Sequence, residues 1–311
     1  MLVGEFGLHN PVVVLTAIGL EYEAVRAHLI DPRRVVYEGT WFEAGEVAGS
    51  GRQVVLAEVG PGNRPTAVIA EQVRTRFTPR AIIFVGVAGS LKPDVRLGDV
   101  VVASRIYAYD GAKHVSDEVF SRPAAWAASH DLLQAAKHAL RGTEWTGRVR
   151  AGAFESDGPP TVHFKPVAAG ETLLSSMDSE LRERLTRVFN DAVAVEMESA
   201  GLAEAAAIGG VKTLTIRGIS DYADGAKASA DARGMQGVAA AHAAAAAMTA
   251  LAALPLSVGE GGVDGQGSST SDGAAVQGLT QVNTADRKGV VNAVQNGSLT
   301  INHHGSQATE R

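Results

Sequence analysis

The chain has 311 residues, 45% of them hydrophobic, which is enough to bury the core of one large domain or two small ones. Its formal net charge is -6, so no chain-wide basic field favours a nucleic-acid partner, and we expect none. The sequence has no cysteine, which excludes disulfides, thiolate nucleophiles and cysteine-based zinc sites. The first ten residues lack the basic flank and apolar stretch of a signal peptide, so we expect a cytoplasmic protein.

Strands and helices are predicted to alternate along residues 1–255. Apolar or alternating runs predict strands over 12–18, 41–47, 53–59, 81–85, from 98 onward, 193–196 and 211–217. Helices are expected over 21–29, 65–77, 123–141, 178–188, 197–208 and 233–253. This order predicts an α/β fold with three α/β/α layers and a central mixed, mostly parallel sheet. Ligands of such sheets bind beyond the carboxyl ends of the strands, which directs attention to the loops after Val85, Val195 and Ile216.

The segment Val238–Leu256 is the one run whose length suits a membrane span. It is mostly alanine and includes His242, so its apolar drive into a bilayer is weak. Alanine favours helix, and we therefore expect a buried terminal helix and no membrane partner.

The composition changes after Pro255. Residues 256–274 are rich in glycine and serine and predict a flexible linker. Residues 275–311 alternate β-forming residues with asparagine and glutamine, which is typical of a short cross-β segment, although a plain disordered tail is the alternative. We therefore predict one catalytic domain over 1–255, a linker over 256–274 and a C-terminal tail.

Acidic residues follow three predicted strands: Glu21 and Glu23, then Glu196 and Glu198, then Asp221. Cleavage of a glycosidic bond by water needs one group that protonates the departing base and another that activates water. A third carboxylate can accept hydrogen bonds from ribose hydroxyls. This chemistry requires no metal and no organic cofactor, and we expect neither. Each acid alone also suits a helix first turn or a cap, which leaves a structural role open.

Four motifs together resemble those of methylthioadenosine/S-adenosylhomocysteine nucleosidases and of the wider nucleoside phosphorylase superfamily. They are Val85–Gly89, Gly98–Val101, Val195–Glu198 and Arg217–Asp221, and their order and spacing match along roughly residues 11–254. The resemblance implies a phosphorylase-like fold, a homodimer, and an N-ribosyl hydrolase that releases adenine or a related purine from a nucleoside or nucleotide.

By this resemblance, Asp221 protonates the imidazole ring of the purine, and Glu198 holds the ribose hydroxyls. Met197 would pack beneath the sugar, and Glu196 would border the sugar site. Glu23 matches the family's water-activating glutamate. The further substrate-binding residues that the resemblance implies are Val87, Ala88, Gly89, Leu173, Leu174, Ser220 and Arg217.

The sequence departs from the family at two of these positions. Val87 stands where the family has serine, and Leu173 stands where it has a base-stacking phenylalanine. A carboxylate near the attacking group favours water and repels phosphate, whereas Arg26, Arg64 and Arg217 keep a phosphate-dependent phosphorylase open as an alternative.

The segment Asp221–Lys227 and the alanine-rich helix after it resemble the phosphorylase-type domains of conflict effectors. That resemblance allows a larger adenylate as the substrate. It also leaves open a third hypothesis, in which the domain senses a nucleotide and the tail recruits a partner or self-assembles.

Overall fold

A computed structural model of the chain describes residues 8, 10–116, 118–149, 158–172, 174, 176, 178–224 and 234–255. The predicted linker and tail, residues 256–311, lie outside the described residues. The domain boundary near Pro255 and the character of the tail therefore stay predictions.

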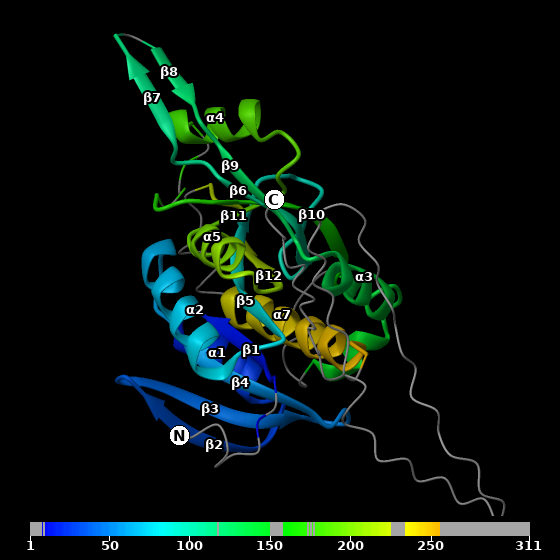
Figure 1. Cartoon of the computed structure of the whole chain (residues 1–311). Helices are drawn as coiled ribbons and strands as arrows, with labels where there is room; N and C mark the ends of the chain where they lie inside the picture. Colours follow the sequence, from blue (N-terminus) through cyan, green and yellow to red (C-terminus); the bar gives the residue numbers. More distant parts are fainter. Residues whose placement is uncertain are drawn as a thin grey trace, which may run out of the picture. The chain divides into compact units, whose positions relative to one another are not determined.

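The described residues form the strands and helices labelled in Figure 1. The strands are β1 (Val12–Thr16), β2 (Leu29–Tyr37), β3 (Thr40–Val47), β4 (Arg52–Glu58), β5 (Ala81–Ser90), β6 (Val100–Ala108), β7 (Ala112–Val115), β8 (Glu118–Ser121), β9 (Ala124–Ala127), β10 (Val162–Ala169), β11 (Ala194–Glu196) and β12 (Thr213–Asp221). The helices are α1 (Gly19–Arg26), α2 (Asn63–Phe77), α3 (His130–Ala139), α4 (Glu180–Val188), α5 (Ser199–Gly209) and α7 (Met235–Ala252), with a 3-10 turn over Glu144–Arg148.

Helices cover both faces of the central sheet, which confirms the predicted three layers (Figure 1). On one face, α1, α3 and α7 pack through side chains that include Val25, Leu132 and Met248. On the other face, α2 and α5 pack through side chains that include Ala70 and Leu202. The central strands alternate between these two clusters and are buried on both sides, as their unbroken apolar sequences predict.

The sheet is mixed, and it folds back on β5. Its order is β11-β10-β6-β12-β5-β1-β4-β3-β2, with a further pairing between β11 and β5. Parallel pairing joins β4, β1, β5 and β12, and a second parallel group contains β6, β10 and β11. Antiparallel pairing of β12 with β6 and of β5 with β11 connects the two groups. The strand β5 therefore pairs with strands of both groups.

The strand β5 changes its neighbour halfway along its length. Its pairing with β1 ends at Phe84, opposite Leu15, and its pairing with β11 begins at Gly89, opposite Val195. Between these points, residues 86–88 pair with β12 on one edge, and no described strand pairs with them on the other. This gap opens the sheet at the carboxyl ends of β1 and β5, where an α/β fold binds its ligands.

Several elements differ from the sequence prediction. The helix predicted to reach Leu29 ends at Arg26, and the edge strand β2 follows at once, with a register shift around Pro32, which cannot donate to the ladder. The helix predicted from residue 123 begins only at His130, because residues 124–127 form β9. The strands β7, β8 and β10 were not predicted, and β5 continues through Ser90, where a loop was expected.

The helix α7 is the buried terminal helix that the sequence predicts. Among the described residues, it is the one helix whose length and hydropathy would suit a membrane span, and 72% of it is buried inside the fold. Gly218 of β12 lets the backbone of this helix approach closely, because a Cβ atom at Gly218 would lie 1.9 Å from the Ala239 carbonyl oxygen.

Candidate active site

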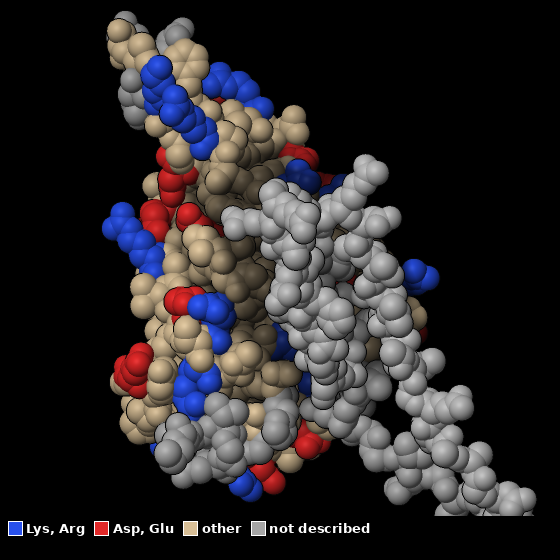
Figure 2. Space-filling model, viewed as in Figure 1, with Lys and Arg blue, Asp and Glu red and all other residues tan. Residues whose placement is uncertain are grey.

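A pocket of about 210 Å³ lies at the gap beside β5, between the ends of β1, β11 and β12. Most of its wall is apolar, and the titratable side chains among its described lining residues are all carboxylates. The lining residues are Ala17, Ile18, Glu21, Pro61, Val87, Ala88, Gly89, Thr172, Leu174, Val195, Glu196, Met197, Glu198, Ser220, Asp221, Ala223 and Gln236. Over the face of the molecule in Figure 2, basic and acidic side chains are interspersed and are not sorted by sign.

Glu21 occupies the first turn of α1 and is 3% exposed. Its carboxylate accepts the main-chain N–H groups of Ala17 at 2.8 Å and Ile18 at 3.2 Å, which fixes the entry into the helix. The other carboxylate oxygen accepts the N–H of Val87 at 2.8 Å, so Glu21 replaces the strand neighbour that β5 lacks at this point. Burial raises the pKa of Glu21, against the lowering by Arg217 and by these hydrogen bonds.

Glu196 and Glu198 lie at the end of β11, where the chain enters α5. Both are 6% exposed. Glu196 accepts the N–H groups of Glu198 and Ser199 and the Ser199 hydroxyl, whereas Glu198 accepts the N–H of Gly62 at 3.1 Å. Burial, and more weakly the charge of Glu198, raises the pKa of Glu196 to about 7, although Arg217 opposes this shift.

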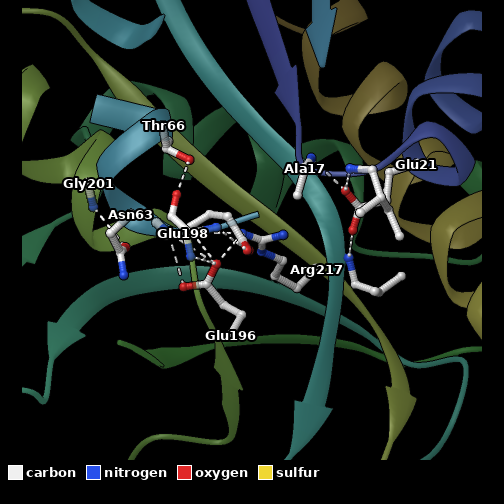
Figure 3. A network of polar contacts seen from close by, with 12 residues as sticks. Ala17, Glu21, Asn63, Thr66, Glu196, Glu198, Gly201 and Arg217 are labelled. Carbon is white, nitrogen blue, oxygen red and sulfur yellow. Dashed lines mark hydrogen bonds and ion pairs between the residues drawn. The ribbon is translucent and has the colours of Figure 1, made fainter. Parts of the chain in front are cut away.

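Arg217 connects the carboxylates from behind the pocket (Figure 3). Its side chain is fully buried, and its Nη2 donates to Glu196 and to Glu198. The guanidinium lies 4.4 Å from the centre of the Phe84 ring, a cation-π contact. The Nη1 and Nε atoms of Arg217 are buried and have no hydrogen-bond partner among the described residues.

The absence of a side chain at Gly86 lets Arg217 reach the region of Glu21. A Cβ atom at Gly86 would lie 2.2 Å from Arg217 Nη1 and 2.6 Å from a Glu21 carboxylate oxygen. The two charged groups therefore meet above the same glycine, and Figure 3 shows Arg217 between Glu21 and the pair Glu196 and Glu198. A single guanidinium thus faces carboxylates on both sides of the pocket.

Asp221 ends β12 on a different wall of the pocket. One of its carboxylate oxygens accepts the N–H of Ala223 at 2.9 Å, and the other accepts the Ser220 hydroxyl at 2.9 Å. These two contacts fix the orientation of the carboxyl group, which is 7% exposed. Gly89 packs against it, because a Cβ atom there would lie 2.9 Å from an Asp221 oxygen.

The structure brings most of the predicted site residues together in this pocket. They are Val87, Ala88, Gly89, Leu174, Glu196, Met197, Glu198, Ser220 and Asp221. Leu173 lies outside the described residues. Arg217 is fully buried beside the pocket and is not among its lining residues, so its part in substrate binding stays a prediction.

The structure does not place Glu23, the predicted water-activating residue, at this pocket. Glu23 is exposed and lines a separate surface pocket with Tyr22, Arg26 and Trp41. Two residues correspond to about 200° of helix rotation, so Glu21 and Glu23 point to opposite sides of α1. The carboxylate that reaches the pocket from this helix is that of Glu21.

Sequence reasoning also missed other lining residues: Ala17, Ile18, Pro61, Thr172, Val195, Ala223 and Gln236. Ala17 and Ile18 follow β1 directly, and the rule that ligands bind at strand ends indicates them. Gln236 comes from the start of α7 and carries no motif that marks it. Within the described ranges, no group of three or more His, Asp or Glu side chains is placed to hold a metal ion.

Residues 11–255 match the Phosphorylase superfamily, which is more than half of the chain, and the chain therefore belongs to that superfamily. It is similar to a 5'-methylthioadenosine/S-adenosylhomocysteine nucleosidase of Mycobacterium bovis, with 28% identity over 240 residues that cover 73% of this chain and 91% of the relative. It is also similar to the ATP nucleosidase Cap17 of Escherichia coli, with 28% identity over 240 residues that cover 71% of this chain and 48% of that protein.

The fold agrees with a solved structure of the same class. The 5'-methylthioadenosine/S-adenosylhomocysteine nucleosidase of Neisseria meningitidis, in complex with methylthio-immucillin-A, superposes with a TM-score of 0.66 and 25% identity. The match covers 79% of this chain and 100% of that one. This similarity confirms the predicted α/β architecture.

Proposed function

We propose that this chain is an N-ribosyl hydrolase that releases a purine base, adenine, from a nucleoside or nucleotide. The observation that carries the proposal is the arrangement of buried carboxylates around one pocket. Glu21 comes from α1, Glu198 from the start of α5 and Asp221 from the end of β12. Hydrolysis of a glycosidic bond needs such separated acid and base groups around one sugar.

Asp221 is the proposed proton donor to the leaving base. Its carboxyl group is oriented by Ser220 and by the Ala223 N–H, and the small residues Ala88 and Gly89 leave space for a flat ring beside it. A protonated ring nitrogen makes the base a better leaving group. The role requires Asp221 to carry a proton at the moment the base departs.

Glu198 is the proposed acceptor for the ribose hydroxyls. Gly62 donates to one oxygen of its carboxylate and Arg217 to the other, and Glu198 lines the pocket beside Met197. A carboxylate next to the sugar also stabilises the positive charge that develops on the ring in the transition state. Met197 supplies an apolar floor for the sugar.

Glu21 is the proposed base for the attacking water. Its burial raises its pKa, which strengthens it as a proton acceptor. Arg217 Nη1 is a buried donor above the same glycine as a Glu21 oxygen, so the pair offers a water both an acceptor and a donor. This donor compensates for the hydroxyl that Val87 does not provide.

The reaction balances with these three groups. The bond between the base and C1' of the ribose breaks, and its electron pair goes to the base, which takes a proton from Asp221. The water oxygen forms a new bond to C1' and gives a proton to Glu21. Transfer of that proton through solvent to Asp221 restores the starting state. Among the described residues, carboxylates line the pocket and no cationic side chain does, which favours water over phosphate as the nucleophile.

Adenine is the base shared by the compounds that the similar nucleosidases are named for, since methylthioadenosine, S-adenosylhomocysteine and ATP all contain it. These substrates differ only at the 5' position of the ribose. The proposal is therefore specific for the base and leaves the 5' substituent to experiment. The homodimer, the cytoplasmic location and a tail-mediated partner stay predictions from the sequence.

Release of free adenine by the purified chain and by the variant Asp221→Asn tests the proposal. Asparagine retains one oxygen for the Ala223 N–H, and its NH₂ group replaces the oxygen that accepts the Ser220 hydroxyl, but it has no proton of comparable acidity to give. We expect a loss of about 10²- to 10⁴-fold in kcat. The variant Ser220→Ala is the matched control, because it removes an orienting contact and leaves the acid in place, and we expect a much smaller loss. Equal rates for Asp221→Asn and the wild type would overturn the assignment.

A further inference from the structure

Two successive residues at the end of β6 hold a loop of the pocket. The Tyr109 hydroxyl donates to the main-chain carbonyl of Thr172 at 2.7 Å. The Asp110 carboxylate accepts the N–H of Glu171, also at 2.7 Å. Thr172 lines the pocket, whereas Tyr109 and Asp110 do not. One strand end thus fixes a stretch of pocket wall that is 61 to 63 residues away in the sequence.

The Tyr109 ring also packs tightly against the start of this loop. Tyr109 is only 1% exposed, and a Cβ atom at Gly170 would lie 2.3 Å from its ring. The ring belongs to a cluster that includes Leu174, Val195 and Ala223, three residues that line the pocket. Tyr109 therefore backs one wall of the pocket without reaching its interior.

Tyr109 lies behind the wall of the pocket that carries Asp221, the proposed proton donor. The N–H of Ala223 binds the Asp221 carboxylate, and Ala223 is in the Tyr109 cluster. This wall is therefore where the base would lie. The loop is also tied to the sugar side, because the Gly170 N–H donates to the Glu196 carbonyl at 3.2 Å.

We propose that Tyr109 and Asp110 are positioning residues that fix the loop 170–172 and thereby set the affinity of the pocket for the base. The proposal rests on the proposed function, since it assigns the loop to the base side of that site. Neither residue touches the reacting atoms. Their loss should weaken binding of substrate and of free base and leave the bond-breaking step nearly unchanged.

The variant Tyr109→Phe tests the proposal, because it removes the hydroxyl and keeps the ring. Tyr107→Phe is the matched control: Tyr107 lies two residues earlier, in β6, and its hydroxyl donates to Asp191 at 3.0 Å, away from the pocket lining. We would measure kcat and KM for base release and, by calorimetry, the Kd of free adenine. We expect Tyr109→Phe to raise KM and Kd about three- to tenfold, the change that one net hydrogen bond supports. The control should leave both constants unchanged.

Asp110→Ala provides a second test, because Asp110 is exposed and its truncation leaves the core intact. The same rise in KM and Kd is expected from it, and the double variant with Tyr109→Phe should weaken binding further. If the wild type releases base and folded Tyr109→Phe and Asp110→Ala keep the wild-type KM and Kd, the positioning role is refuted. A fall in kcat at constant KM also refutes it. Failure of the wild type to release any base refutes the proposed function instead, and the adenine Kd values of wild type and variants still decide the role of the loop.

Discussion

The same change, from glutamate to glutamine, should have very different effects on kcat at Glu21 and at Glu23. Glu21 lines the pocket and contacts β5, whereas Glu23 is exposed two residues further along the same helix. If Glu21 activates the water, Glu21→Gln removes the base and should lower kcat by about 10²- to 10⁴-fold. Glu23→Gln changes the same charge on the same helix and should leave kcat close to that of the wild type. Initial rates of adenine release from the two variants provide the comparison.

A loss of folding must be separated from the loss of the base. The Glu21 carboxylate accepts three main-chain N–H groups, from Ala17, Ile18 and Val87. A glutamine would turn its NH₂ group toward at least one of these donors, at a cost of about 1 to 3 kcal/mol in the free energy of unfolding. Thermal melts would show this change, and rates would be compared well below the lower melting temperature. A Glu21→Gln variant that is folded and fully active, or an inactive Glu23→Gln variant, would refute the assignment.

Three further predictions concern the Glu198 carboxylate, the pH dependence that Glu21 imposes, and the buried Asp99 carboxylate. Glu198→Gln removes a charged acceptor of the ribose hydroxyls, so kcat/KM should fall about 10- to 100-fold, and an unchanged value would contradict this role. Burial raises the pKa of Glu21 above its ordinary value of 4.5, and water activation needs the deprotonated carboxylate. We therefore expect kcat/KM to rise with pH through a midpoint above 4.5, and we expect Glu21→Gln to lack this rise. A midpoint at or below 4.5 would contradict the role of Glu21. Burial raises the pKa of Asp99, but hydrogen bonds from His163, Thr161 and Arg96 outweigh it and lower the pKa. Asp99→Asn should therefore lower the free energy of unfolding by about 2 kcal/mol, measured as a lower Tm at neutral pH, and leave kcat unchanged. The difference in Tm between wild type and variant should shrink as the pH falls and the wild-type carboxylate becomes protonated.

The sequence predicts the layers and the centre of the sheet because burial leaves a local signal there. The strands β1 and β5 have unbroken apolar sequences, and the motif residues Glu198 and Asp221 directly follow or end strands whose positions are easy to predict. The strand β2 has no such signal. It is a largely exposed edge strand that contains Pro32, and only its pairing with β3 makes it a strand.

The choice between Glu21 and Glu23 depends on where α1 begins. Both acids suit a helix first turn, and a shift of two residues moves a side chain to the opposite face. The helix begins at Gly19, which turns Glu21 toward the gap beside β5. That gap arises from a change of strand neighbours, which is a property of the whole sheet. The roles of Tyr109 and Gly86 likewise depend on contacts between residues far apart in the chain, and no local pattern indicates them.

Product analysis with purified protein and a panel of purine compounds shows directly whether the chain is a hydrolase. Methylthioadenosine, S-adenosylhomocysteine, adenosine, inosine and ATP would each be incubated with and without phosphate, and the products separated by chromatography. We expect free adenine from at least one adenine compound, at a rate that is independent of phosphate. Base release only in the presence of phosphate would identify a phosphorylase, and no base from any compound would contradict the assignment of Asp221, Glu21 and Glu198 to hydrolysis.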